Sequence, residues 1–412
     1  MMTLGVLAFV VALLTSVMLH EAGHFLTAKA FGMKATQFFV GFGPTLWSRI
    51  KGETEYGVKA IPAGGFVKII GMTPLEEVPT EDRPRAFINK GGWQRFVVLV
   101  AGSTVHFIIA LVLLFVLAIA WPSKSTGYAT VNEVYTCALP DDNLKCPPGA
   151  TPAPAHGVLQ KGDVIIAIDG HDLKTTPAVL KGPGLPADGE HVQGGSDGAA
   201  ALIRQSSGPL QLTIKRDGVV RQILITPVVA KGQPHLGFQP GNQVKRVGAI
   251  AAAGAAFTNF GQGVTGSFAA LGKVPHELGQ IFSAHHEKRT IDSGGGQVTS
   301  TIGVARLAGE GFSDNGFSGG LALLIAITAS VNLFVGIFNL FPLLPLDGGH
   351  VAILAYEKAR DRVRRRRGLA PGGPVDLTKL MPVTYTALAL IVGVSVVLLY
   401  ADVTNPVANP FQ

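Results

Sequence analysis

Four segments of this chain are long and apolar enough to cross the ~30 Å hydrocarbon core of a bilayer as helices. They span residues 4–28, 96–121, 321–341 and 382–401. Across the whole chain 47% of residues are hydrophobic and 15% are charged, and the mean hydropathy is +0.36. These values exclude an ordinary soluble enzyme and a disordered chain. The sequence therefore predicts an α-helical polytopic membrane protein.

The charges between these spans predict an orientation. Lys and Arg outnumber Asp and Glu by 10 to 6 in residues 28–95 and by 8 to 3 in residues 351–380, whereas residues 122–318 carry 16 against 15. Basic loops stay on the cytoplasmic side of a membrane. We therefore expect a multi-pass protein of the cytoplasmic membrane, with both termini and the long central segment outside.

A tract of four arginines, Arg364 to Arg367, follows the third span. Clusters of basic residues bind nucleic acid in some proteins and anionic lipid in others. Because this tract lies next to a span, we interpret it as anchoring to the bilayer and expect no nucleic-acid partner.

The first span contains the motif His20-Glu21-Ala22-Gly23-His24. In H-E-x-x-H the two imidazoles lie on one helix face and can bind one Zn²⁺, while the Glu is placed to act as a general base. Ionisable groups are costly inside a membrane, so a functional role is the default interpretation there. A buried structural pair of histidines is the alternative.

A catalytic zinc needs a third protein ligand and an open position. Asp347 is the candidate, in the segment 339–350 (NLFPLLPLDGGH), where prolines and glycines interrupt the third span. Irregular backbone at membrane depth is tolerated where it lines an enclosed or wet cavity. The charge-derived topology also brings Asp347 and the histidines to the cytoplasmic half of the bilayer. His350 is a competing ligand, or a residue that supports the site.

The motifs H-E-x-x-H and N-x-x-P-x-x-P-x-D-G-G together resemble the site-2 protease family (peptidase M50 type) of intramembrane zinc metalloproteases. The nearest type is the bacterial one with a single extracytoplasmic PDZ domain, which acts in regulated intramembrane proteolysis. Gly41-Phe42-Gly43-Pro44 and residues 53–62 (ETEYGVKAIP) add to the resemblance.

The resemblance implies a role for each matching residue. His20, His24 and Asp347 would hold one Zn²⁺ per chain, and Glu21 would be the catalytic base. Asn339 would contact the substrate, although an Asn that packs between helices is the alternative. The implied substrates are single-span membrane proteins, such as anti-sigma factors or remnant signal peptides, already trimmed by a site-1 protease.

The segment Ala101-Gly102-Ser103-Thr104-Val105-His106 departs from the family pattern, which is commonly A-G-P-x-x-N. Here Ser103 replaces the usual Pro and His106 the usual Asn. His106 lies ~15 Å into the second span, so we expect a polar residue of the site rather than a ligand.

Residues 54–70 alternate in character and predict a β-hairpin within a β region spanning 35–72. By the resemblance this is a membrane-associated element beside the zinc. Its residues Gly57, Val58, Lys59 and Ala60 would bind an extended substrate by strand addition. An ordinary cytoplasmic hairpin is the alternative.

The central segment resembles a PDZ domain. Residues 157–170 (GVLQKGDVIIAIDG) predict a buried strand between two turns, and residues 210–226 predict a hairpin around Asp217-Gly218. PDZ domains bind peptide ends by strand addition, and in this family the domain is also described as a size filter. Cys137 and Cys146 predict one disulfide in an oxidising compartment, with two free thiols as the alternative.

The expected domains are residues 1–126, 127–230, 231–318 and 319–412. The first and last form the membrane protease core, the second is the PDZ domain, and the third is an amphipathic helical linker outside the membrane. The adjacent His285 and His286 within it predict solvated side chains rather than a metal site.

Two other functions compete with the protease. A metal transporter would need ligands on more spans and internal repeats, which the sequence lacks. A membrane-anchored PDZ adaptor without protease activity would have no need of Glu21 as a general base.

Overall fold

The computed structural model describes residues 1–72, 78–122, 124–138, 146–175, 177–180, 190–230, 232–282, 300–314, 316–370, 372–373, 375 and 377–404. The chain divides into two compact units. One consists of Met1–Ala118 with Ala249–Gln412, and the other of Ile119–Gly248.

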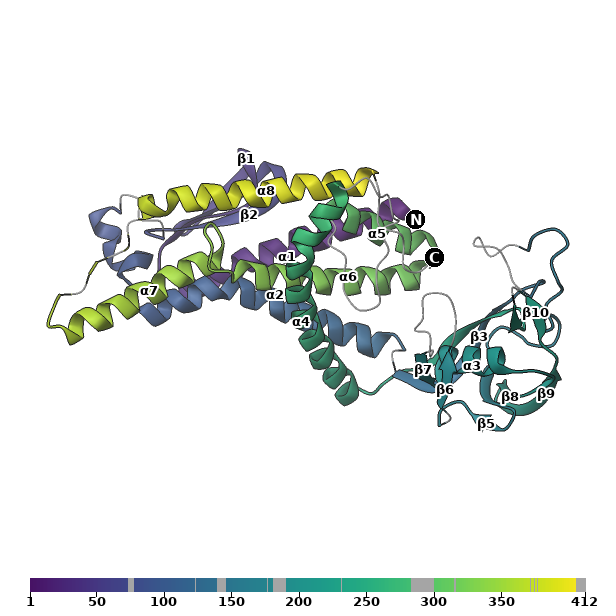
Figure 1. Cartoon of the computed structure of the whole chain (residues 1–412). Coiled ribbons are helices and arrows are strands. Elements are labelled where there is room, and N and C mark those ends of the chain that lie inside the picture. Colours follow the sequence, from purple (N-terminus) through teal and green to yellow (C-terminus); the bar gives the residue numbers. More distant parts are fainter. Residues whose placement is uncertain are drawn as a thin grey trace. The chain divides into compact units, whose positions relative to one another are not determined.

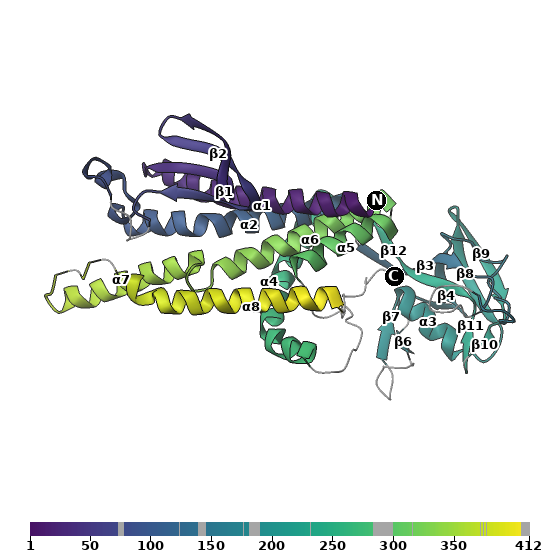
Figure 2. The same ribbon diagram turned by 90° about the horizontal axis from the view of Figure 1, so that it is seen from above.

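The first unit contains the four predicted spans. They are the helices α1 (Met2–Ala30), α2 (Gly92–Ala120), α6 (Gly316–Asn339) and α8 (Met381–Thr404), all long and apolar enough to cross a membrane. Figures 1 and 2 show α1, α2 and α6 side by side. The prediction of a polytopic membrane protein is confirmed. Helix α6 ends two residues before the predicted boundary at 341, because a proline-containing turn follows it.

Three further helices complete this unit. They are α4 (Ala249–Phe282), which crosses the long helices in Figures 1 and 2, α5 (Thr301–Asp314) and α7 (Asp347–Arg366). The short 3₁₀ helices are η1 (Thr80–Arg85), η2 (Phe87–Asn89) and η3 (Leu377–Leu380).

Helix α5 corrects the predicted linker 231–318. It packs against α1 and α6, with Phe312 buried among apolar residues of both helices. Small residues allow this approach: a Cβ on Gly5 would lie 2.6 Å from the Ala308 carbonyl oxygen. Residues 301–314 therefore belong to the helical bundle rather than to a linker.

The strands β1 (Ala35–Lys51) and β2 (Thr54–Ile69) form an antiparallel pair joined by a turn at residues 52–53. They lie beside α1 and contact it. The expected β region is thus present in the first unit, and its two strands bend so that each pairs with the other over more than one stretch.

The prediction of a hairpin within residues 54–70 is wrong. Residues 37–40 of β1 lie between its two halves: Phe38, for example, is opposite both Tyr56 and Val67. The alternating pattern correctly indicated extended backbone, but it carried no information about which strand would insert between the two halves.

The second unit is built on a sheet with the strand order β12-β3-β4-β8-β9, with β5 paired to β4. The strands are β3 (Lys124–Val134), β4 (Val164–Ile168), β5 (His171–Asp172), β8 (Leu210–Arg216), β9 (Val219–Ile225) and β12 (Phe238–Lys245). Two smaller pairs are β6 (Pro177–Leu180) with β7 (Glu190–Gln193) and β10 (Val228–Ala230) with β11 (Gln233–His235). Helix α3 (Gly195–Gln205) packs on β3 and β12.

The structure confirms two local predictions in this unit. The buried strand within 157–170 is β4, and the hairpin at Asp217-Gly218 is β8-β9, where both turn residues have positive φ. The expected boundary at residue 230 is wrong, because β12 pairs with β3 and extends the unit to Gly248. Cys137 and Cys146 are joined by a disulfide in the structure. His285 and His286 lie outside the described residues.

An ion-pair network ties the β1-β2 turn to the end of α1. Both carboxylate oxygens of Glu53 accept hydrogen bonds from the Arg85 guanidinium at 2.6 and 2.8 Å, and Lys29 Nζ lies 2.5 Å from Oε1. These cations lower the pKa of Glu53 from 4.5 to about 2, Arg85 contributing most.

We predict that this network makes stability depend on pH. Because its pKa is lower in the folded state, Glu53 contributes stability above pH ~4.5, and that contribution is lost as the pH falls toward 2. Glu53→Gln should lower the unfolding free energy by ~1 kcal/mol at pH 7, a small value because the network is partly exposed. Thermal unfolding in detergent at pH 7 and pH 3 measures this.

The exposed Glu81 provides the control. Glu81→Gln should leave the midpoint unchanged at both pH values, whereas the deficit of Glu53→Gln should shrink at pH 3. An equal deficit at the two pH values would contradict the assignment.

Candidate metal centre

Helix α1 places the imidazoles of His20 and His24 on one face, both buried. Nδ1 of His24 lies 2.7 Å from the Val98 carbonyl oxygen of α2. Since a carbonyl only accepts hydrogen bonds, Nδ1 carries the proton, and in the neutral ring the lone pair is on Nε2. The two Nε2 atoms lie 3.2 Å apart. This tautomer is the one that an Nε2 metal ligand requires.

Asp347 reaches the same point from α7. Helix α6 ends at Asn339, a tight turn follows, and Asp347 is the first residue of α7. The amide dipoles at a helix N-terminus favour an anion there. A Cβ on Gly348 would lie 2.2 Å from the Leu340 carbonyl oxygen, so the close approach of α7 to the end of α6 requires glycine.

The three side chains have the geometry of a tetrahedral metal site. Oδ2 of Asp347 lies 3.5 Å from Nε2 of His20 and 3.3 Å from Nε2 of His24. With Zn–N and Zn–O bonds of ~2.0–2.1 Å, a tetrahedron has edges of about 3.3 Å. Oδ2 is also buried and has no hydrogen bond with any residue that the structure describes. These residues fit a zinc ion and leave one coordination position open.

Glu21 lies between the ligands in sequence and faces the β strands. Its Oε2 accepts a hydrogen bond of 3.1 Å from the backbone amide of Val67. Among the residues that the structure describes, Gly65, Phe66 and Val67 pair with β1 on one side only, and the Val67 N–H points out of the sheet toward Glu21 of α1. The β region therefore borders the site, as the sequence analysis expected, and an edge strand holds the carboxylate.

His106 lies beside the ligands on α2. Its ring is 4.9 Å from the His20 ring, centroid to centroid, and Nδ1 is 2.8 Å from Oδ1 of Asn332 on α6. Asn332 Nδ2 donates to Oγ of Ser16, at 3.0 Å, and to the Thr328 carbonyl. These contacts form a polar network across three apolar helices.

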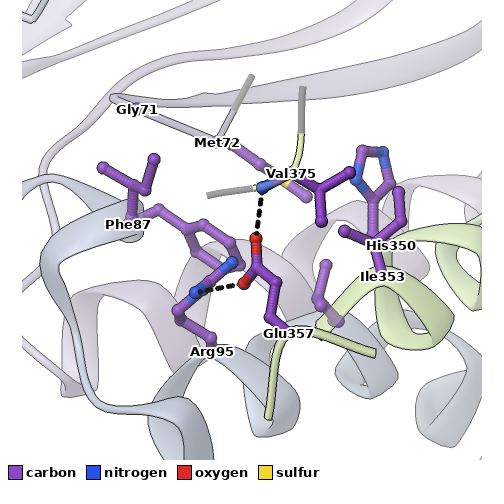
Figure 3. Close-up of a pocket in the computed structure, with 10 residues that line it drawn as sticks. Gly71, Met72, Phe87, Arg95, His350, Ile353, Glu357 and Val375 are labelled. Carbon is purple, nitrogen blue, oxygen red and sulfur yellow. Dashed lines mark hydrogen bonds and ion pairs between the residues drawn. The ribbon is translucent and has the colours of Figure 1, made fainter. Parts of the chain in front are cut away.

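His350 lies three residues after Asp347 on α7 and lines a cavity of about 30 Å³ (Figure 3). Across this cavity Arg95 Nη1 donates to Oε2 of Glu357 at 3.2 Å, and the Val375 amide donates to Oε1. His20, His24 and Asp347 form a group of possible ligands without His350.

The residues expected to bind substrate are in two places. Asn339 is half-buried at the end of α6, and its side chain makes no hydrogen bond with another described residue. Gly57 and Val58 are paired on both sides, with β1 residues 37–40 and 45–51, and Lys59 is opposite Thr45. Gly57 and Val58 therefore do not present a free strand edge, because β1 pairs with both sides of them.

Sequence reasoning missed three residues of the site: Asn332, Ser16 and Gly102. Asn332 is a polar residue within an apolar span, which is a recognised signal of a helix contact. Gly102 leaves the space that the ligands occupy, since a Cβ there would lie 2.4 Å from both His20 Cε1 and His24 Nε2.

Comparison with known proteins identifies the family of the chain. Residues 8–372 match the family model described as peptidase family M50. The chain belongs to this family. The resemblance predicted from the two motifs is therefore confirmed, and the protein is a metallopeptidase.

Relatives of this M50 peptidase match it over nearly its whole length. The zinc metalloprotease Rip1 of Mycolicibacterium smegmatis is 35% identical over 439 aligned residues, covering 99% of each chain. The zinc metalloprotease Rip1 of Mycobacterium tuberculosis is 34% identical over 429, again covering 99% of each. Metalloprotease MmpA of Caulobacter vibrioides is 26% identical over 413, covering 91% of each.

We predict that Gly102→Ala removes metal from this M50 peptidase. The added methyl group would overlap both imidazoles, so His20 and His24 could not keep their positions. Zinc affinity should fall at least ~10–100-fold, measured by chelator competition on purified protein.

Gly393→Ala on α8 is the matched control, because nothing lies within 4 Å of its Cβ position. It should bind zinc like the native protein. Full zinc affinity in Gly102→Ala would show that the ligands do not pack against α2 in this way.

Proposed function

We propose that this M50 peptidase is a zinc-dependent intramembrane endopeptidase that cuts single-span membrane proteins within their membrane segments. The observation that carries the proposal is the tetrahedral placement of three ligand atoms near the Glu21 carboxylate, with both histidines and Glu21 on α1, a helix long and apolar enough to span a bilayer. In this assignment His20, His24 and Asp347 hold Zn²⁺, and Glu21 is the general base.

The residues divide the chemistry between them. Zn²⁺, when bound, polarises the peptide carbonyl and makes a water easier to deprotonate. Glu21 takes the proton of the attacking water and then delivers it to the departing amine. Val98 keeps His24 in the tautomer whose Nε2 is free to bind metal. Asn339, which has a free amide at the end of α6, contacts the substrate backbone.

A substrate strand would add to the outer edge beside Val67 rather than to Gly57–Ala60. That edge carries the Val67 amide, which donates to Glu21 at 3.1 Å. Helical amides are internally paired, so the scissile segment has to become extended before it is cut. Pairing with this edge would satisfy its amides and would release Glu21 from Val67 toward the attacking water.

The proposal also covers the central domain, the orientation in the membrane and the substrates. The unit Ile119–Gly248 is a PDZ domain on the extracytoplasmic side, both termini are outside, and the active site lies in the cytoplasmic half of the inner membrane. The substrates are anti-sigma factors or similar proteins that a site-1 protease has already trimmed. The six-stranded sheet with α3 packed on it supports the domain assignment.

Cleavage of a tagged single-span substrate by purified protein tests the mechanism. Glu21→Gln should lower the rate by ~10²–10⁴-fold and keep zinc, because the amide cannot accept a proton. Asp347→Ala should lose zinc together with activity, because it removes a ligand.

Glu310→Gln on α5 is the control for replacing an acidic residue inside the bundle, since Glu310 pairs with Arg306 and not with the metal group. It should cut like the native protein. If Glu21→Gln cut at the native rate, the proposed chemistry would be wrong.

We predict that the substrate can be cross-linked to one edge of the β region only. Lys68 and Arg49 are both exposed, next to Val67 and on the stretch 45–51 respectively. In a Glu21→Gln background, Lys68→Cys should form a disulfide with a cysteine near the cut site, and Arg49→Cys should not. Equal cross-linking at the two positions would argue against addition at the edge beside Glu21.

A further inference from the structure

The two candidate histidine ligands differ in the hydrogen bonding of their second ring nitrogen, Nδ1. Nδ1 of His24 donates to the Val98 carbonyl at 2.7 Å, whereas Nδ1 of His20 is buried and has no hydrogen-bond partner among the described residues. Metal-binding imidazoles ordinarily donate this second N–H to an acceptor, which fixes the tautomer and the orientation of the ring. His20 therefore needs an acceptor.

His106 has a ring nitrogen that can accept a hydrogen bond but receives none from a described residue. Nδ2 of Asn332 donates to the Thr328 carbonyl at 2.8 Å, and since a carbonyl only accepts, the orientation of the Asn332 amide is fixed. Its Oδ1 thus faces Nδ1 of His106, 2.8 Å away, and that nitrogen carries the proton. The lone pair of the neutral ring is on Nε2, to which no described residue donates.

The unpaired donor and the unpaired acceptor belong to rings in contact. The centroids of His20 and His106 are 4.9 Å apart, and the rings are tilted by 40°. A hydrogen bond of ~3 Å between two ring nitrogens places the centroids about 5 Å apart. His106 is only 3% exposed, so its ring is held inside the helical bundle.

We propose that His106 is a positioning residue for the metal centre: its Nε2 accepts the Nδ1 proton of His20, and Asn332 holds His106 in the required tautomer. The bond forms when the His20 ring turns its Nδ1 toward His106. The proposal rests on the proposed role of His20 as a zinc ligand. The His106 bond would fix the tautomer and orientation of His20, as the bond to the Val98 carbonyl does for His24.

Ser16 extends this support to the helix that bears the ligands. Its hydroxyl accepts from Asn332 Nδ2 at 3.0 Å, one helical turn before His20. The network thus joins α1, α2 and α6 around one ligand. The Gly102 backbone also borders His20 and is the competing acceptor for Nδ1.

Zinc affinity, measured by chelator competition on the full-length protein in detergent, tests the proposal without relying on activity. His106→Phe keeps a ring but removes the acceptor nitrogen. Asn332→Leu removes the hydrogen bond that keeps the proton on Nδ1 of His106. Each should weaken zinc binding ~10–100-fold. The double variant should be no weaker than the worse single variant, because both changes act through one nitrogen.

Two further variants sharpen the test. His106→Gln, whose amide oxygen reaches the Nε2 position, should recover most of the affinity. Ser330→Ala on α6 removes an exposed hydroxyl that donates to the Ala326 carbonyl, outside this network, so it should bind zinc like the native protein. His106→Phe and His106→Gln can be compared with each other even if Asn332→Leu fails to fold.

Native zinc affinity in His106→Phe would overturn the proposal. The Gly102 carbonyl would then be the acceptor for Nδ1 of His20. A complete loss of zinc in His106→Phe, equal to that in His20→Ala, would overturn it by making His106 a ligand. If His20→Ala itself kept zinc, the failure would lie in the proposed metal site, and this proposal would fall with it.

Discussion

The structure depends on bringing two imidazoles and a carboxylate together inside a bundle of apolar helices. Each group alone would be costly to bury, and together they still require a cation and fixed hydrogen bonds. The bundle supplies a glycine wherever these groups need space: Gly102 lies against both rings, and Gly23 lets α1 approach the Ala101 carbonyl of α2. The tight packing of these helices is therefore a condition for the site.

The candidate ligands could be predicted from the sequence because each lies in a short pattern with a chemical meaning. His20 and His24 are one helical turn apart, and Asp347 follows a proline-rich break in a span. Their supports could not be predicted in this way. Asn332 is 226 residues from His106 and 316 from Ser16, so only the folded chain shows that they meet.

The β region shows a different limit. Alternation identified residues 54–70 as extended, but strand order depends on the insertion of residues 37–40 between its halves. Gly57 looked suited to hold a substrate, yet its missing side chain makes room for Phe39 and the Trp47 carbonyl. Likewise α5 has a modest apolar face, and only its contacts with α1 and α6 reveal that it belongs to the bundle.

The junction of α6 and α7 has a mechanical consequence. Gly348 lies against the Leu340 carbonyl, and a Cβ on Gly349 would lie 2.6 Å from the Leu344 amide, so the start of α7 has no room to slide over the end of α6. We therefore expect α6 and the start of α7 to move together as one rigid body. A membrane segment that displaced α6 would carry the Asp347 carboxylate with it, which links helix spacing directly to the shape of the metal site.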